Sequence, residues 1–226
     1  MSMPYENQLL GAFLYALGYQ GGQSHAAHVS ANLFQQTPLD QTFGDLIVGA
    51  SHCLALEFKR DEASLKSEQR KWQEDDFERA RLDKTLCQIA AKAHFMVYAI
   101  PETQGIELRC AQYYRCIRPA APFQSFPAQA LIKTIHLGPK HAHEPLGVSP
   151  TELEWYLRQL ENIKRKTSGG RSSDQATWLA VAHNPSGLRF MTAQSLTQLL
   201  ELKREHVPTP EPSPSRSRDR GYDLGM

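Results

Sequence analysis

The sequence lacks several features that would assign it to a class at once. None of its four cysteines forms a CxxC pair or shows the spacing of a zinc site, and no apolar run approaches the length of a membrane span. The N-terminal segment MSMPYENQ has neither the basic part nor the apolar part of a signal peptide. These absences predict a soluble, cytoplasmic protein with reduced thiols and no membrane partner.

An excess of charge of one sign is also lacking. The 226 residues include 25 lysines and arginines and 24 aspartates and glutamates, which gives a formal net charge of +1. Because there is no global positive field, any binding of nucleic acid must come from local basic patches. A phosphate-binding P-loop and the G-x-S-x-G elbow of a hydrolase are missing too, which argues against ATP use and triad chemistry.

What the sequence does contain is a periodic alternation of apolar and polar residues. Apolar residues make up 41% of the chain, enough for a hydrophobic core. The patterns predict helices over residues 5–19, 24–34, 66–93, 150–165 and 192–205, and strands over residues 43–50, 53–59, 95–100, 106–117, 178–183 and 188–191. Gly21-Gly22 is expected to end the first helix, and a break is expected near Asp75-Asp76. This order predicts an α/β protein with a mixed sheet flanked by helices.

A proline-rich connection at residues 119–127 divides the chain. We expect a core over residues 1–118, a C-terminal α/β extension over residues 119–206, and a disordered tail rich in proline, serine and arginine over residues 207–226. Within the extension, Ser149-Pro150-Thr151-Glu152 is a capping box that begins a helix. The extension can add to the sheet, recognise a substrate or dock a partner, and the sequence leaves these alternatives open.

Three residues with the chemistry for phosphodiester hydrolysis fall on neighbouring expected strands. Asp45 begins one strand, and Glu57 and Lys59 follow in the next. Because side chains alternate along a strand, Glu57 and Lys59 share one face. Carboxylates bind Mg²⁺, which activates water and polarises phosphate, and a nearby lysine can orient that water or offset transition-state charge. The plainer alternative is a solvated strand face with a cross-strand ion pair, although Glu57 lies within an otherwise apolar strand.

In this context, Gly44-Asp45 followed by Glu57-Phe58-Lys59 resembles the PD-(D/E)xK nuclease superfamily. The resemblance covers roughly residues 5–100. It implies a restriction-endonuclease-like fold in which Asp45 and Glu57 bind Mg²⁺ or Mn²⁺ and Lys59 assists the nucleophilic water. It also implies that the main-chain carbonyl of Phe58 joins the metal shell. Gly44 stands where the family name has proline.

A RecB-type core of this superfamily implies two further site residues. One is a catalytic, metal-binding glutamate on the first helix, which matches Glu6. The other is a catalytic glutamine on the helix after the lysine strand, which matches Gln69. The tyrosine of the usual Q-x-x-x-Y motif is missing, because Gln69 is followed by Arg70, Lys71, Trp72 and Gln73.

Two groups of basic residues are candidates for contacts with a nucleic-acid backbone. The first lies beside the acidic motif and comprises Arg60, Lys66, Arg70 and Lys71. The second lies in a glycine-containing loop and comprises Lys164, Arg165, Lys166 and Arg171. An ordinary solvated surface would look similar in both places.

The resemblance therefore implies a metal-dependent endonuclease or exonuclease that hydrolyses phosphodiester bonds, in DNA rather than RNA. Small nucleases of this type resemble parts of prokaryotic DNA-processing or antiviral defence systems in which a protein partner supplies targeting, and many of them form homodimers. One alternative is a catalytically inactive member of the fold that serves as a binding or assembly module in a nucleoprotein complex. Another is an RNA- or nucleotide-directed member of the same fold.

Overall fold

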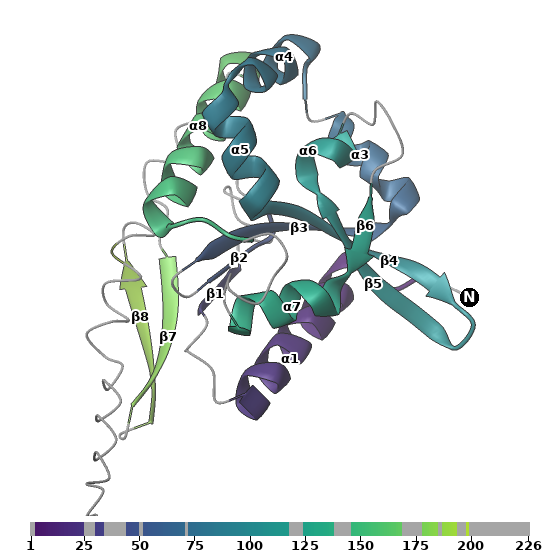
Figure 1. Cartoon of the computed structure of the whole chain (residues 1–226), viewed down its shortest axis with the longest axis vertical. Helices are drawn as coiled ribbons and strands as arrows, with labels where there is room; N and C mark the ends of the chain where they lie inside the picture. Colours follow the sequence, from purple (N-terminus) through teal and green to yellow (C-terminus); the bar gives the residue numbers. More distant parts are fainter. Residues whose placement is uncertain are drawn as a thin grey trace, which may run out of the picture.

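A mixed six-stranded sheet runs through the molecule, and helices cover both of its faces (Figure 1). The computed structural model describes residues 3–24, 30–33, 44–49, 52–70, 72–117, 124–137, 146–168, 178–184, 187–193 and 198. The strands are β1 (Ser30–Leu33), β2 (Leu46–Gly49), β3 (Cys53–Asp61), β4 (His94–Glu102), β5 (Gly105–Gln112) and β6 (Ser125–Pro127). They lie side by side in chain order; β3 and β4 are parallel, and the other neighbours are antiparallel.

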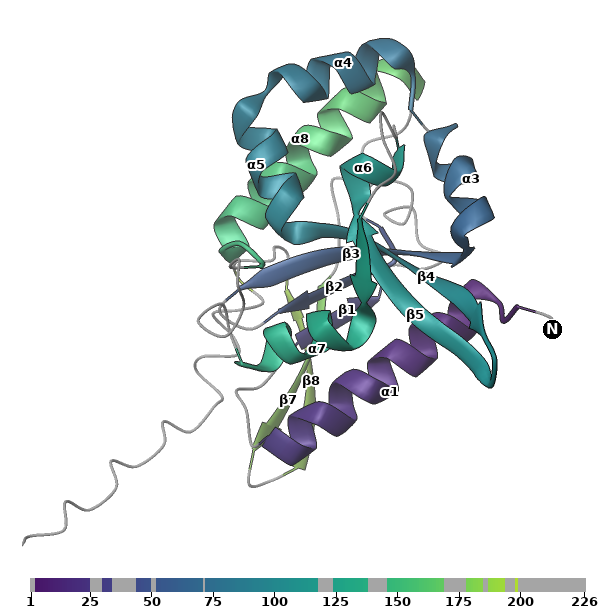
Figure 2. The ribbon, with the colours of Figure 1, turned by 45° about the vertical axis from the view of Figure 1, so that its right-hand side comes forward.

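The helices form one layer on each face of this sheet, so the predicted α/β class with a mixed sheet flanked by helices is confirmed (Figure 2). They are α1 (Glu6–Ser24), the 3-10 turn η1 (Glu62–Ser64), α3 (Leu65–Gln69), α4 (Glu74–Leu82), α5 (Lys84–Ala93), α6 (Tyr113–Ile117), α7 (Ala128–Leu137) and α8 (Pro150–Ser168). A separate hairpin consists of β7 (Trp178–Asn184) and β8 (Gly187–Ala193). No helix in these ranges is long and apolar enough to span a membrane.

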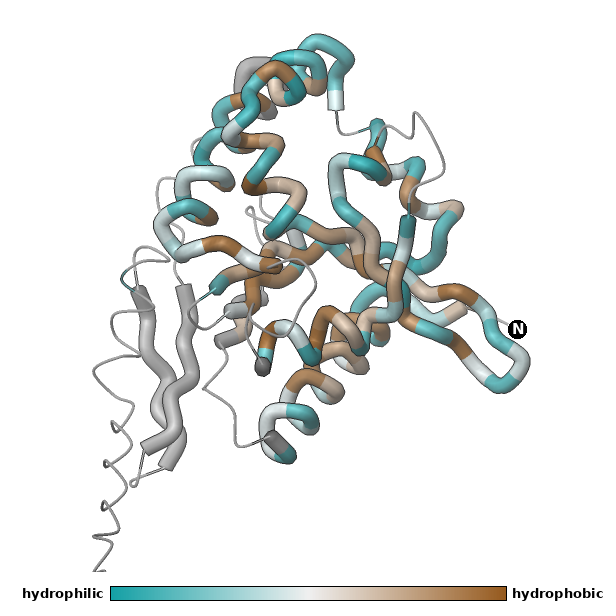
Figure 3. Tube along the Cα trace, in the orientation of Figure 1, coloured by the Kyte–Doolittle hydropathy of each residue, from teal (hydrophilic) through white to brown (hydrophobic). Residues whose placement is uncertain are grey.

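Side-chain alternation along β3 and β4 divides the interior into two cores. Leu54, Leu56 and Phe58 pack with α1 and α7, whereas Cys53 and Ala55 pack with α5, α6 and α8. Because helices cover both sides, the central parallel pair is buried along most of its length, from Cys53 to Lys59 in β3 and from His94 to Ala99 in β4, as expected for parallel strands. Figure 3 shows hydrophobic residues concentrated in these strands and hydrophilic residues on the outer helix α4.

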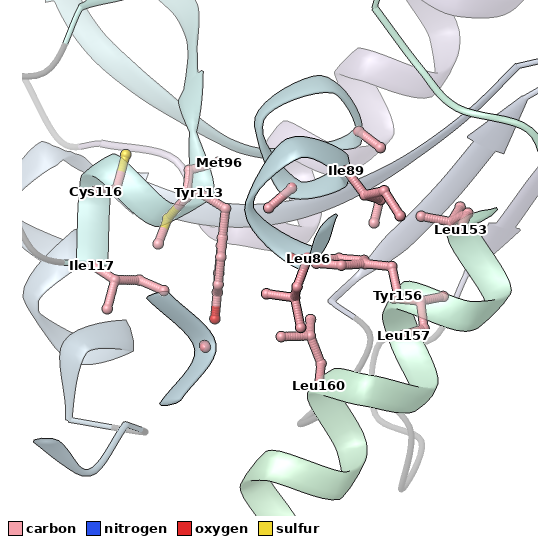
Figure 4. Packing of buried hydrophobic residues seen from close by; sticks show 14 of the residues in the cluster. Leu86, Ile89, Met96, Tyr113, Cys116, Ile117, Leu153, Tyr156, Leu157 and Leu160 are labelled. Atoms are coloured by element: carbon pink, nitrogen blue, oxygen red, sulfur yellow. The ribbon is translucent and has the colours of Figure 1, made fainter. Parts of the chain in front are cut away.

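The end of the proline-rich connection adds strand β6 to the sheet, and the segment after it completes both helical layers. Strand β6 pairs with β5, and α7 packs on the same face of the sheet as α1. On the other face α8 packs against α5, with Tyr156, Leu157 and Leu160 directed between the two helices (Figure 4). The chain enters α8 through two backbone hydrogen bonds between Val148 and Cys53 of β3, at 2.7 and 3.2 Å. Strand β6 and helices α7 and α8 are therefore built into the same α/β layers as the elements of the first hundred residues.

The predicted capping box is confirmed at the start of α8. The Ser149 amide donates to Glu152 Oε2 at 2.8 Å, and the Glu152 amide donates to Ser149 Oγ at 3.2 Å. The predicted hairpin is confirmed as β7 and β8. Helix α7 was not predicted, since its ten residues follow directly on the proline-rich connection.

Several predicted boundaries were wrong. Helix α1 continues through Gly21-Gly22 to Ser24, and residues 30–33 form β1 instead of a helix because they pair with β2. The strand predicted over residues 106–117 ends at Gln112, where α6 begins. The predicted break at Asp75-Asp76 falls inside α4; the helical run instead breaks after α3 and at Asp83, whose carboxylate caps α5 by accepting from the Leu86 amide.

Other predictions fall partly or wholly outside the described ranges. Thr192 lies in β8 and does not cap a helix, and the predicted helix over residues 192–205 is otherwise outside the description except for residue 198. The tail over residues 207–226 is outside it entirely. Residues 164–166, predicted in a loop, belong to the last turns of α8.

Candidate functional site

A cluster of buried charged side chains lies where β2 and β3 run side by side. Asp45 and Lys59 are each 5% exposed, Glu57 is 2% exposed, and Glu68 of α3 is 1% exposed. Glu57 and Lys59 share the face of β3 that carries Cys53 and Ala55, as strand alternation predicts. The alternative of a solvated strand face is wrong, because none of these charges faces open solvent.

Asp45 is held at the beginning of β2 by two hydrogen bonds to β3. Its amide donates to the Leu56 carbonyl at 3.0 Å, and its Oδ2 accepts from the Phe58 amide at 2.6 Å. Two residues further on, Ile47 belongs to the same core as Ala55. By alternation, Asp45 therefore lies on the sheet face that carries Glu57.

Gly44, directly before Asp45, has a backbone conformation that proline cannot adopt. Its φ is +83°, a conformation that glycine adopts readily and that the proline ring forbids. A Cβ at this position would lie 3.0 Å from the Leu56 carbonyl oxygen and 3.4 Å from Glu57 Oε2. The turn therefore approaches β3 closely and places the Glu57 carboxylate beside the Gly44-Asp45 backbone.

Lys59 lies between two carboxylates. Its Nζ is 2.5 Å from Glu57 Oε1 and 3.4 Å from Glu68 Oε2. Burial by itself lowers the pKa of Lys59, but the charges of Glu57 and Glu68 together with the Glu57 hydrogen bond outweigh it, and the pKa lies above the ordinary lysine value. Lys59 is therefore a positively charged ammonium at neutral pH and not a free amine.

Glu6 and Phe58 take different places around this cluster. Glu6 begins α1, and its carboxylate accepts from the Arg60 amide at 3.3 Å at the end of β3. Its charge also favours protonated Lys59, as the smallest of the contributions that raise the pKa of that lysine. The ring of Phe58 points to the opposite face, where it meets Phe13 edge-on with ring centroids 5.6 Å apart.

Gln69 is turned away from the cluster. Its side-chain amide donates to the Cys116 carbonyl of α6 at 3.2 Å. The neighbouring Glu68, which the sequence analysis did not single out, faces Lys59 instead. A helical signal for it exists: Leu65, Glu68 and Trp72 are spaced three and four residues apart and all are buried.

The basic candidates lie in different settings. Arg60 is half-buried; its Nη2 donates to the Met3 carbonyl at 2.9 Å and its guanidinium lies over the Tyr5 ring, 5.5 Å from the centroid. Lys66 on α3 and Arg70 directly after it are exposed. Lys164, Arg165 and Lys166 belong to the last turns of α8. Lys71 and Arg171 lie outside the described residues.

The donor atoms of the cluster suit a hard divalent cation, since carboxylate oxygens are the ligands that Mg²⁺ prefers. Asp45 and Glu57 supply two such groups from adjacent strands on one face. Within the described ranges, however, no three histidine, cysteine, aspartate or glutamate side chains converge as a ready-made metal group. In this arrangement it is the Lys59 ammonium that lies against Glu57 and Glu68.

Comparison with known proteins adds no further assignment. No protein-family model, no curated protein and no solved structure matches this chain. The class of protein must therefore be inferred from the residues of the cluster themselves.

Proposed function

We propose that this protein is a nuclease of the PD-(D/E)xK type that uses Mg²⁺ or Mn²⁺, with Asp45, Glu57 and Lys59 as its central residues. The observation that carries the proposal is the burial of these three side chains together at the junction of β2 and β3. Stability alone does not account for such a group, because buried ion pairs are often no more stabilising than apolar side chains of similar volume.

The order of the elements supports the restriction-endonuclease-like core on which the proposal rests. Helix α1 begins with Glu6, β2 directly follows Asp45, and β3 carries Glu57 and Lys59. The helices α3 to α5 then lead to β4, which lies parallel to β3. Strand β1 stands between α1 and β2, so the order has one strand more than the helix, strand, strand and helix that the resemblance implies.

In the proposed reaction, Asp45 and Glu57 hold the cation, and the Phe58 carbonyl and Glu6 are the additional ligands that the resemblance implies. A bound Mg²⁺ would polarise the phosphate and lower the pKa of a water molecule. Lys59, kept as an ammonium by its carboxylate neighbours, would donate to the water or to a phosphate oxygen and offset the negative charge that develops there. It would not serve as the general base in that protonation state.

The proposed substrate is DNA in preference to RNA, and the proposed setting is prokaryotic DNA processing or antiviral defence, as the resemblance implies. The exposed positions of Lys66 and Arg70, on the segment that also carries Glu68, support a role in contacting phosphates. Such contacts would weaken as salt concentration rises.

The test is cleavage of plasmid DNA, single-stranded DNA and RNA by the full chain with Mg²⁺, Mn²⁺ or EDTA. Asp45→Asn and Lys59→Met should each lower the cleavage rate by about 100-fold or more, because the first removes a charge that would hold the cation and the second removes the ammonium that would offset charge on the phosphate. Matched controls are Asp75→Asn and Lys84→Met, which change exposed residues of α4 and α5. Cleavage that persists in EDTA, or equal rates in all four variants, would refute the proposal.

A catalytically inactive binding or assembly module is the second candidate. Two observations favour it. The Lys59 ammonium already balances the charges of Glu57 and Glu68. In addition, no three potential metal ligands converge within the described ranges. On this alternative no nucleic acid is cut with either metal. The wild type should still bind labelled DNA, and a Lys66→Glu, Arg70→Glu double variant should bind it more weakly.

A further inference from the structure

Glu68 is the most deeply buried charged residue of the cluster, and both of its oxygens have identified neighbours. Oε1 accepts a hydrogen bond from the Tyr113 hydroxyl at 2.7 Å, and Oε2 lies 3.4 Å from Lys59 Nζ. A carboxylate with one oxygen fixed in this way has little freedom to rotate. Its second oxygen is consequently directed at the lysine.

Tyr113 is itself fixed from several sides. Its hydroxyl donates to Glu68 and accepts from Trp72 Nε1 at 3.1 Å, so its donor and one acceptor position are both used. The ring stacks on His94 of β4 with centroids 3.8 Å apart and planes 8° from parallel. His94 Nδ1 in turn is 2.7 Å from the Tyr156 hydroxyl of α8. Figure 4 shows Tyr113 extending from α6 beside Met96 and near the α5–α8 contact.

The protonation state of Tyr113 suits it to hold the Glu68 carboxylate. Burial first, and then the charges of Glu68 and Glu57, raise its pKa well above the ordinary tyrosine value. The hydroxyl therefore keeps its proton at neutral pH and can donate it to Glu68.

We propose that Glu68, held by Tyr113, is a positioning residue that keeps the Lys59 ammonium between two carboxylates. The catalytic meaning of this position rests on the function proposed above. Glu57 meets Lys59 through Oε1, while its Oε2 lies beside the Gly44-Asp45 turn. In this proposal the second carboxylate, Glu68, shares the ammonium with Glu57 Oε1 and so keeps Lys59 from closing over both oxygens of Glu57, which leaves Glu57 Oε2 beside the Gly44-Asp45 turn.

The experiment measures the reactivity of the Lys59 amine in the full-length protein, by acylation at pH 8 followed by peptide mass spectrometry. Glu68→Gln removes the charge at nearly constant volume, and Tyr113→Phe removes only the hydroxyl that holds Glu68. Both should raise the acylation rate of Lys59 by about tenfold or more, because Nζ loses the ion-pair partner that holds it in the buried cluster and away from the reagent. Glu62→Gln, which changes an exposed glutamate of the neighbouring η1 turn, should leave the rate unchanged.

Two internal controls separate positioning from general loosening of the fold. Lys66 is exposed on the same segment and should react at the same rate in every variant. Cys110, which is fully buried in the core beneath α1 and α7, should stay equally resistant to alkylation. If Lys59 becomes reactive only together with Cys110, or stays as unreactive in both variants as in the wild type, the positioning role is refuted.

Cleavage kinetics provide a second and separate measurement. Loss of a residue that orients a catalytic group should lower kcat by about 10- to 100-fold with KM little changed. A rise in KM of about 10- to 100-fold with unchanged kcat would overturn the positioning role. If the wild type cuts no substrate while Lys59 reactivity still rises in both variants, the nuclease proposal fails and the positioning of Lys59 by Glu68 is supported.

Discussion

The two faces of the sheet differ sharply in what they bury. The core beneath α1 and α7 is apolar, with Leu and Phe side chains from β2, β3 and β4. The opposite face has an apolar core of its own, yet it also carries the buried polar and charged residues of the sheet, of which Glu57, Lys59 and His94 are examples. Since both faces are covered by helices, burial alone does not explain this segregation.

On the proposed function, one face maintains the fold while the other combines packing with a charged site. Buried charge destabilises a protein unless each charge has partners, so a fold that needs a charged site gains by confining it to one region. Here the partners extend from Lys59 through Glu68 to Tyr113, and across the ring contact to His94 and Tyr156. The apolar face contributes the other side chains of the same strands and so fixes their position.

The largest expected effect comes from opening the apolar face. Phe58→Ala should lower the free energy of unfolding by about 3–5 kcal/mol, because it leaves a cavity in a fully buried site against Phe13. The measurement is urea denaturation followed by circular dichroism. Leu82→Ala is the control, and because this leucine is exposed at the end of α4 it should change stability by no more than about 0.5 kcal/mol. Equal losses of unfolding free energy in Phe58→Ala and Leu82→Ala would show that Phe58 does not belong to a core that maintains the fold.

A smaller effect should appear on the polar face, where single hydroxyl groups are decisive. Tyr156→Phe removes the hydroxyl beside His94 Nδ1 and should cost about 1–2 kcal/mol. Tyr114→Phe should be neutral or slightly stabilising, because the Tyr114 hydroxyl is buried without a hydrogen-bond partner in the described part of the chain. The two variants make the same chemical change, but only Tyr156→Phe should lower the melting temperature, whereas Tyr114→Phe should leave it unchanged or raise it slightly. A loss of stability in Tyr114→Phe as large as in Tyr156→Phe would contradict the hydrogen-bond network.

Local patterns were sufficient to predict the α/β class, the neighbouring strands β2 and β3, and the shared face of Glu57 and Lys59. Each of these follows from strand alternation and short-range hydrophobic periodicity, which a sequence displays directly. The capping box at Ser149 was likewise predictable, because its two hydrogen bonds join residues three positions apart.

The errors arose where distant contacts override local preference. Residues 30–33 have no strong strand pattern and become β1 through pairing with β2, while β5 gives way to α6 at Tyr113, whose ring stacks on His94 of another strand. Glu68 was missed for the same reason. Its partners Lys59 and Tyr113 are nine and 45 positions away, and no sequence motif relates residues that are 45 positions apart. The resemblance implied a role for the adjacent Gln69 instead.

The smallest expected effect is a pH dependence confined to the polar face. Burial, followed by the charges of Tyr114 and Cys87, raises the pKa of Tyr156 well above the ordinary tyrosine value. The stabilisation linked to this raised pKa is fully present below pH 10, and it is lost as the pH rises because the unfolded chain then releases a phenolic proton that the folded chain keeps. The difference in unfolding free energy between wild type and Tyr156→Phe should therefore be constant from pH 7 to 9 and shrink by roughly 1 kcal/mol or less near pH 10.5. The corresponding difference for Phe58→Ala should stay constant over the same range, since that substitution removes no titrating group. Parallel curves for the two variants would show that Tyr156 titrates alike in the folded and unfolded chain, which its complete burial beside His94 does not allow.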